Sequence, residues 1–291
     1  MAGSELKRRV AVAAVGIPAG VVVIYLGGWV LGLVVAALAA LGTRELFGLA
    51  QSRGRAPFTW LGVSAAVLIV GAAMWSPQFL TAIAWMWLIV LTLTLAALVS
   101  AIWLRGTEGN PLDAVAITVV GTIYVGGTLS FAVFIRELPL ADGIARAGWE
   151  GAVLVLFPLA VTWASDSAAY FAGKRWGRRK LMPSVSPGKT VVGGVAALMG
   201  ATLAAAIYGH LFLADLVTLR VGPVAVVGMG VAIGVAAQVG DLVESVLKRA
   251  AGVKDSGRLL PGHGGVLDRF DSLFLVLPLT YGLFYLVRSA G

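Results

Sequence analysis

One polar stretch, residues 241–272, concentrates the residue types that could do chemistry in an otherwise apolar chain. It holds five of the fourteen carboxylates, five of the twenty-two lysines and arginines, and one of the two histidines. Its first half is predicted to be helical, because Asp241, Glu244, Ser245 and Lys248 are spaced i, i+3, i+4 and i+7 and therefore share one helix face. Residues 252–265 are rich in glycine, contain a proline and are predicted to form a loop.

The second half of the stretch combines acidic and basic groups around that loop. Asp268 and Asp271 open the last apolar run of the chain, after the loop's lysine, arginine and histidine residues. Carboxylate oxygens are the ligands that Mg²⁺ prefers, whereas cations and backbone N–H groups hold phosphate oxygens. The pattern therefore predicts metal-assisted phosphate chemistry.

The order of residues in this stretch is specific as well as polar. It reads Ser245-x-Leu-Lys248-Arg249-x4-Lys254-Asp255-x-Gly257-x2-Leu260-Pro261-x-His263-Gly264-Gly265-x2-Asp268-Arg269-x-Asp271, about 27 residues without a gap. This run resembles the signature of the phosphatidate cytidylyltransferase (CDP-diacylglycerol synthase) family. The resemblance implies a nucleotidyltransferase of phospholipid biosynthesis, which transfers the cytidylyl group of CTP to phosphatidate and gives CDP-diacylglycerol and pyrophosphate. It also implies a homodimer.

The resemblance and the residue chemistry together assign roles as a hypothesis. The metal ligands, for Mg²⁺ as one ion or two, are Asp241 and Asp268 with Asp166 close by and with Glu244 and Asp271 as supporting or alternate ligands. The catalytic group is Asp166, Asp241, Lys248, Arg249, Asp268 and Asp271. The substrate-binding group is Ser186, Lys189, Thr190, Lys254, Arg258, His263, Gly264, Gly265 and Arg269. Within it, His263 either shapes the loop by a hydrogen bond or takes part in catalysis, and the two glycines let backbone N–H groups approach the nucleotide.

Asp166 lies outside the polar stretch, inside an apolar run that is predicted to span the membrane. A carboxylate there costs ~2.5–3.5 kcal/mol on insertion scales. A role as metal or cation partner facing the bundle interior is therefore favoured over a polar cap at the end of the span. The family carries an aspartate, a small hydroxyl residue and a tyrosine here, which Asp166, Ser167 and Tyr170 resemble.

A second phosphate-binding candidate is the segment Pro183-Ser-Val-Ser186-Pro187-Gly188-Lys189-Thr190, which precedes a predicted helix. It is not a P-loop, because Pro183 stands where that motif needs glycine. A lysine and hydroxyls at a helix N-terminus form either an anion site or a simple helix cap. The family has a similar Ser-Pro-x-Lys-Thr segment, although Val192 stands where the family often has glutamate. The basic run Lys174–Lys180 is read mainly as a face that attracts lipid headgroups, with substrate contact as the alternative.

The composition indicates an integral membrane protein. The mean hydropathy is +0.94 and 12% of residues are charged, against about 25% in soluble domains. There are no cysteines, so disulfides and thiolate metal sites are excluded. The net charge of +8 is attributed to anionic lipids and the positive-inside bias rather than to nucleic acid.

The predicted fold is an all-α polytopic bundle of about nine transmembrane helices. The expected spans are 10–26, 29–42, 58–75, 80–104, 112–135, 151–172, 190–213, 222–247 and 271–288. The first two result from splitting residues 10–43 at Gly27-Gly28, and one long tilted helix is the alternative. Placing the N-terminus in the cytoplasm puts 18 cations inside and 4 outside, so the positive-inside rule predicts N-in, C-out. The loop at 252–265 and a basic loop expected at 173–189 would then both lie at the cytoplasmic face of the inner membrane.

We expect one membrane domain with two parts. Residues 1–150, which carry no candidate site residue, would form the lipid-access groove or the dimer surface, and residues 151–291 would form the catalytic part. The spacing Gly230-x-x-x-Gly234 is predicted to be a helix-packing surface. Two rival functions stay open. One is a CTP-dependent polyprenol or lipid kinase, and the other is an ion-coupled transporter that uses the buried carboxylates.

Overall fold

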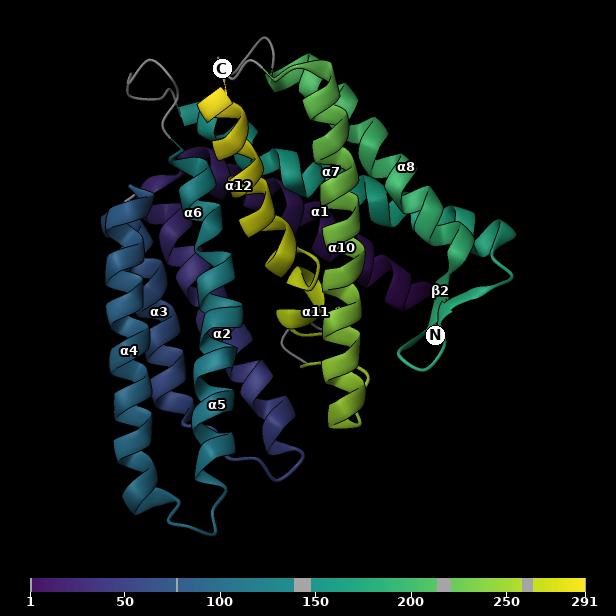
Figure 1. Cartoon of the computed structure of the whole chain (residues 1–291). Helices are drawn as coiled ribbons and strands as arrows, with labels where there is room; N and C mark the ends of the chain where they lie inside the picture. Colours follow the sequence, from purple (N-terminus) through teal and green to yellow (C-terminus); the bar gives the residue numbers. More distant parts are fainter. Residues whose placement is uncertain (1, 77, 139–147, 214–220, 258–263, 291) are drawn as a thin grey trace. The chain divides into compact units, whose positions relative to one another are not determined.

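The computed structural model describes residues 2–76, 78–138, 148–213, 221–257 and 264–290 (Figure 1). The chain divides into two compact units. Unit 1 comprises Met1–Phe134 and Leu247–Phe270, and unit 2 comprises Ile135–Val246 and Asp271–Gly291. The polar stretch is thus divided between the units, because helix α10 begins in unit 2 and ends in unit 1.

The regular elements in the described part of unit 1 are all helices, joined by short connections. Its elements are α1 (Ala2–Leu26), α2 (Gly28–Gln51), α3 (Thr59–Trp75), α4 (Phe79–Leu104), α5 (Pro111–Thr122), the π-helical turn η1 (Ile123–Gly127), the first residues of α6 (Phe131–Arg136), the end of α10 and the short α11 (Leu267–Phe270). In Figure 1, α2, α3, α4 and α5 run side by side as a bundle. Pro111 occupies the first turn of α5, where its missing N–H leaves no helical bond unmade.

Unit 2 combines long helices with one small sheet. Its elements are α7 (Gly148–Trp176), β1 (Lys180–Met182), β2 (Ser186–Thr190), α8 (Val191–Tyr208), the π-helical turn η2 (Gly209–Leu213), most of α10 (Pro223–Ala251) and α12 (Leu273–Ala290). Asp166 lies within α7, as predicted. Asp241, Glu244, Ser245 and Lys248 all lie on α10, which confirms that the first half of the polar stretch is helical.

Seven helical segments of the described residues are long and apolar enough to cross a membrane. They are Gly28–Gln51, Phe79–Leu104, Pro111–Arg136, Trp149–Trp176, Val191–Leu213, Pro223–Ala251 and Leu267–Arg288. Two shorter apolar helices, Ala14–Leu26 and Thr59–Trp75, stand where two further spans were expected. The polytopic helical class is therefore confirmed, whereas nine crossings and the N-in orientation stay predictions.

The predicted break at Gly27-Gly28 is present. Both glycines have positive φ, 60° and 46°, a backbone conformation that costs glycine little and other residues more. The predicted end of the second span at residue 42 is wrong, because α2 continues to Gln51. The charged residues Arg44 and Glu45 extend the helix rather than end it, and Glu45 has partners in its own unit that are described below.

The all-helical prediction also missed one element. The segment 173–189 was expected to be a basic loop, but α7 continues to Trp176 and an antiparallel β-hairpin follows. The hairpin pairs Lys180 with Thr190 and Met182 with Ser186. Pairing satisfies backbone groups that an open loop would leave to water, and it brings the chain directly into the start of α8.

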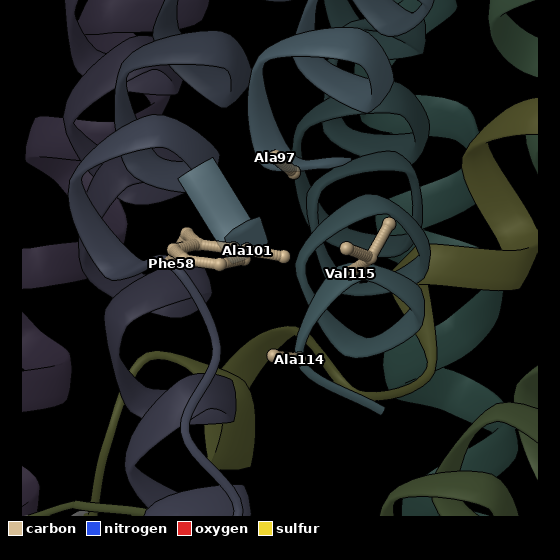
Figure 2. Packing of buried hydrophobic residues seen from close by; sticks show 5 residues of the cluster. All are labelled: Phe58, Ala97, Ala101, Ala114 and Val115. Carbon is tan, nitrogen blue, oxygen red and sulfur yellow. The ribbon is translucent and has the colours of Figure 1, made fainter. Parts of the chain in front are cut away.

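Unit 1 is held together at one end by small side chains. Figure 2 shows Ala97 and Ala101 of α4 facing Ala114 and Val115 of α5, with Phe58 beside them, and all five are buried. Small residues let membrane helices approach closely, so that dispersion and backbone contacts replace a hydrophobic driving force.

Glycines have the same role in unit 2, where α7 and α8 pack along each other. A Cβ added at Gly200 of α8 would lie 2.6 Å from the Cβ of Ala168 on α7. A Cβ at Gly230 of α10 would lie 2.7 Å from the Cα of Thr202, and one at Gly234 would lie 2.9 Å from the Cβ of Ala201. The predicted packing role of Gly230 and Gly234 is therefore confirmed.

Candidate active site

The described residues hold two groups of polar side chains, one in each unit. We define the pocket cluster, in unit 2, as Asp166, Lys189 and Asp241 together with the residues that line the pocket around them. We define the loop cluster, in unit 1, as Glu45, Lys248, Ser256, Gly265 and Asp268. Helix α10 contributes Asp241 to the first cluster and Lys248 to the second.

The pocket has a volume of about 660 Å³. Its walls come from the last turns of α7, the β-hairpin, the first turns of α8 and the middle of α10. Two carboxylates and three lysines line it: Asp166, Asp241, Lys174, Lys180 and Lys189. A cavity of this size can hold a nucleotide-sized ligand, and the convergent charges suit phosphate and a cation.

Lys189 connects the hairpin to α10. Its Nζ lies 2.7 Å from Oδ2 of Asp241 and donates a longer hydrogen bond, 3.4 Å, to the backbone oxygen of Gln238. The two charged side chains are 23% and 34% exposed. Because the pair is open to the pocket, both groups are accessible to a bound ligand, and a phosphate or a cation could replace either half of the pair.

Negative charge exceeds positive charge among the groups that interact with Asp166, although the pocket lining as a whole has three lysines and two aspartates. The charge of Asp166 interacts with those of Asp271, Asp241 and Lys189. The approach of Asp271 depends on Gly240, where an added Cβ would lie 2.8 Å from the Asp271 backbone oxygen and 2.9 Å from the Cα of Ser272. Three aspartates with one lysine favour binding of a further cation by simple electrostatics.

The donor set fits a hard divalent ion in kind, since such ions prefer carboxylate oxygens. Among the described residues, no three histidine, aspartate or glutamate side chains are grouped as a preassembled metal site. Glu244, another predicted ligand, lies three residues beyond Asp241 on α10 and is 1% exposed. The metal-ligand assignments, including the pairing of Asp241 with Asp268 from the other unit, stay predictions.

The second phosphate-binding candidate lies at the start of α8. Thr190 is the N-cap, and its hydroxyl accepts a 3.1 Å hydrogen bond from the N–H of Gly193. The helix-cap alternative is therefore what the structure describes for Thr190, which is buried but still lines the pocket. Lys189 also lines the pocket, whereas Ser186, at the other end of β2, is not one of the lining residues.

The loop cluster is built around Asp268. Its Oδ1 lies 2.6 Å from the Nζ of Lys248, and its Oδ2 accepts hydrogen bonds from the N–H of Ser256 (2.8 Å), the hydroxyl of Ser256 (2.9 Å) and the N–H of Gly265 (2.8 Å). The side chain is 7% exposed. Both oxygens of Asp268 therefore already interact with donors from α10 and from the loop. A metal ion would have to share Asp268 with these donors or displace them.

The two predicted loop glycines have a clear structural requirement. Gly264 has a φ of 78°, and an added Cβ would lie 2.5 Å from Oδ2 of Asp268. An added Cβ at Gly265 would meet Oε2 of Glu45 and would lie 2.5 Å from the Ser256 hydroxyl oxygen. The glycines were expected to let the backbone approach a nucleotide, and in the structure they let it approach these two carboxylates.

Three of the remaining predicted cations lie within the described residues. Arg249, Lys254 and Arg269 are exposed, and Arg249 donates a 3.2 Å hydrogen bond to the backbone oxygen of Val253. Arg258 and His263 lie outside the described residues. The roles assigned to all five residues stay predictions.

Sequence reasoning missed several members of both clusters. Glu45 is the most important, because residues 1–150 were expected to contribute no site residue. Its only mark in the sequence is that it is a carboxylate three residues past the predicted end of a span at residue 42. Gln238 of α10 and Ser256 of the loop carried no charge to mark them. Lys174 and Lys180, read mainly as a lipid-attracting face, line the pocket.

Comparison with known proteins places the chain in a family. The model of the cytidylyltransferase family matches residues 7–287. The chain is 31% identical over 292 residues to the phosphatidate cytidylyltransferase of Synechocystis, covering 94% of each chain. It is 39% identical over 172 residues to the phosphatidate cytidylyltransferase of Bacillus subtilis, covering 59% of this chain and 58% of that one.

A further relative is the Escherichia coli protein named uncharacterized protein YnbB, which is 40% identical over 193 residues, covering 61% of this chain and 62% of that protein. The chain thus matches about three-fifths of the length of the E. coli and B. subtilis relatives and nearly all of the Synechocystis one. Because the family model extends over almost the whole sequence, the chain belongs to the cytidylyltransferase family.

Proposed function

We propose that this protein transfers the cytidylyl group of CTP to phosphatidate, giving CDP-diacylglycerol and pyrophosphate. The observation that carries the proposal is the pocket of unit 2, where Asp166 and Asp241 face Lys174, Lys180 and Lys189 around about 660 Å³. Family membership and the names of the relatives support the choice of substrates.

The reaction joins two anions and releases a third. An oxygen of the phosphatidate phosphate forms a bond to the α-phosphorus of CTP, and the bond from that phosphorus to the oxygen bridging to the β-phosphate breaks. Pyrophosphate leaves with that bonding pair, so no oxidant, reductant or further co-reactant is needed. The lipid phosphate is already anionic near pH 7, and a strong general base is therefore not required.

The protein's main task is to reduce the repulsion between these anions. Lys174 of α7, Lys180 of β1 and Lys189 of β2 line the pocket, so that three ammonium groups can contact phosphate oxygens from different sides. Charges fixed in advance around developing negative charge lower the barrier without a cost of reorganisation. Lys189 would exchange Asp241 for a phosphate oxygen, which its partial exposure permits.

Mg²⁺ is the proposed cofactor, as one ion or two. Asp166 and Asp241 would hold it, with Asp268, Glu244 and Asp271 as the further predicted ligands. When bound, it would neutralise phosphate charge and polarise the phosphorus–oxygen bonds. In the loop cluster, Lys248 forms a direct ion pair with Asp268, and Arg249, Lys254, Arg258 and Arg269 would neutralise substrate charge.

The decisive experiment uses purified protein in detergent–phosphatidate micelles with CTP labelled at either the α- or the γ-phosphate. Label from the α-position in the lipid product, with Mg²⁺ and phosphatidate both required, supports cytidylyl transfer. Label from the γ-position would instead identify a lipid kinase. No label in lipid from either position, together with no pyrophosphate release, would overturn the enzymatic proposal and favour the ion-coupled transporter.

We also propose that the chain crosses the inner membrane nine times, N-in and C-out, with the active site at the cytoplasmic face, and that it forms a homodimer. The absence of cysteine makes single-cysteine labelling straightforward. Ser76→Cys should react with an impermeant reagent in intact cells, and Ser184→Cys in the hairpin turn should react only after permeabilisation. The reverse pattern would overturn the orientation, and the mass of the detergent-free particle in nanodiscs tests the dimer.

A further inference from the structure

The C-terminal half of α2 has one face that contacts residues 251–257 and 265–267 of the same unit. Gly42, Glu45, Leu49 and Ser52 lie on this face, spaced i, i+3, i+7 and i+10. All of the chemistry predicted from the sequence lies elsewhere, in residues 166–190 and 241–271. The face therefore joins the part of the chain without a candidate site residue to the loop that carries Asp268.

Glu45 makes the central contacts of this face. Its Oε1 accepts a hydrogen bond from the N–H of Val266 (2.9 Å), and its Oε2 accepts bonds from the N–H of Leu267 (2.9 Å) and the hydroxyl of Ser256 (3.1 Å). Two consecutive backbone N–H groups thus bind one carboxylate in a forked arrangement. Hydrogen bonds to a charged acceptor are about twice as strong as neutral ones.

The backbone closes around Glu45 from two sides. An added Cβ at Gly257 would lie 2.7 Å from Oε1 of Glu45, and one at Gly265 would meet Oε2. Residues 256–257 and residues 265–267 therefore both pack against the same carboxylate. Only glycine leaves room for this approach.

The rest of the face supports the same contact. The hydroxyl of Ser52, whose shorter hydrogen bond of 2.8 Å goes to the backbone oxygen of Leu49, also lies 3.3 Å from the backbone oxygen of Ala251. An added Cβ at Gly252 would lie 2.6 Å from Nη2 of Arg53. At the other end, a Cβ at Gly42 would lie 3.6 Å from Val266 and 3.7 Å from Leu267. The contacts extend over about three turns of α2, and Glu45 supplies their charge.

Glu45 and Asp268 are coupled through Ser256. The Ser256 hydroxyl lies 3.1 Å from Oε2 of Glu45 and 2.9 Å from Oδ2 of Asp268. It has one hydrogen and can donate to only one of them at a time, whereas the Ser256 N–H donates to Asp268 throughout. The backbone of residues 265–267 therefore lies between two carboxylates, Glu45 on α2 and Asp268 on α11.

We infer that Glu45 is a positioning residue: it holds the backbone of Val266 and Leu267 at the start of α11, so that Asp268 keeps its place and its ion pair with Lys248. Glu45 acts through this backbone and is not assigned any contact with substrate. The inference deepens the proposed function, and only its kinetic consequence rests on that function.

The test combines amide hydrogen exchange with kinetics for wild type, Glu45→Gln, Glu45→Asp and the control Glu108→Gln. Glu108 is an exposed carboxylate of the same unit, outside both clusters. In Glu45→Gln an amide N–H₂ must face backbone donors, so we expect the Val266 and Leu267 amides to exchange at least about tenfold faster, because a charge-assisted hydrogen bond is lost. Helix α4, remote in sequence, should keep its protection in every variant.

In the proposed reaction, Glu45→Gln should lower kcat by about 10- to 100-fold with little change in the KM for CTP. The reason is that displacement of the backbone beside Asp268 lowers the reaction rate more than it weakens ground-state binding of the substrate. Glu45→Asp keeps the charge and should recover part of both the exchange protection and kcat. Glu108→Gln should match wild type.

Ser256→Ala provides a second route if Glu45→Gln does not fold. It removes one hydroxyl between the two carboxylates and should speed exchange of the same amides by a smaller factor. Unchanged exchange of Val266 and Leu267 in folded Glu45→Gln, or in Ser256→Ala where the first variant does not fold, overturns the inference even if the enzyme is active. If Glu45→Gln speeds amide exchange but the wild-type protein shows no cytidylyl transfer, the inference is supported and the proposed function is rejected.

Discussion

The two polar clusters use the same residue types in opposite ways. In the loop cluster, Asp268 is 7% exposed and its two oxygens lie 2.6 to 2.9 Å from four donor atoms. In the pocket cluster, Asp241 is 34% exposed and its ion pair with Lys189 borders about 660 Å³ of open volume. An aspartate–lysine pair separated by 2.6–2.7 Å occurs in both.

This difference separates carboxylates that hold the protein backbone in place from carboxylates that are available to bind a ligand. A carboxylate that is buried and fully hydrogen-bonded fixes the backbone around it, because removing one partner leaves a costly buried charge. A carboxylate in a half-open pair can exchange its partner for a ligand at little cost. We therefore assign ligand exchange first to Asp241 and Lys189, and loop geometry first to Glu45 and Asp268.

The largest effect is expected for Asp241→Asn. The amide keeps the size of the side chain but removes a negative charge from the pocket, so cation binding and transition-state stabilisation are lost together. We expect kcat/KM for cytidylyl transfer to fall by at least about 10³-fold, with a melting temperature within a few degrees of wild type. Turnover in phosphatidate micelles and thermal unfolding in detergent measure the two quantities, and full activity in a folded variant would contradict the exchange role.

The next effect is expected for Lys189→Met. The substitution keeps the apolar length of the side chain and removes the ammonium group that lies 2.7 Å from Asp241. Loss of one positioned charge should lower kcat/KM by about 10²-fold, and Lys189→Arg should retain more activity than Lys189→Met. Equal activity of all three proteins would show that the pair is structural, like the one in the loop cluster.

A smaller effect on rate, but a clear effect on stability, is expected for Gly265→Ala. The added Cβ would meet Glu45 and Ser256, so the loop must shift, at a cost of about 1–3 kcal/mol. The control is Gly48→Ala on α2, where an added Cβ has nothing within 4 Å and where alanine favours the helix. In detergent, the free energy of unfolding should fall for Gly265→Ala and rise slightly for Gly48→Ala, relative to wild type. Equal stabilities of the two variants would argue that the loop is not tightly held.

The smallest effect is expected for Arg55→Gln. Arg55 pairs with Asp113, and the two side chains are 46% and 45% exposed. Exposed ion pairs contribute about 0–1 kcal/mol, so stability should change by less than about 1 kcal/mol and turnover should be that of wild type. A loss of activity would show that charge at this end of unit 1 matters beyond the two clusters.

The helical membrane class could be predicted because it depends on apolar runs and breaks that are local in sequence. The break at Gly27-Gly28 was found from the glycines alone, and α10 was found from the spacing of Asp241, Glu244, Ser245 and Lys248. The hairpin at Lys180–Thr190 was missed because its strands are three and five residues long, too short for a period of two to show. The length of α2 was missed because Arg44 and Glu45 resemble the polar end of a span.

The sequence by itself determined that this chain is an apolar helical protein and which family it resembles, and it predicted chemistry of phosphate with carboxylates. These properties follow from composition and from the order of residues in one continuous stretch. The tertiary structure alone decided which carboxylate has which neighbours. Glu45 lies 221 residues from Val266 in the sequence, and Lys189 lies 49 residues from Gln238. No local pattern encodes such contacts, because they exist only once the helices have packed.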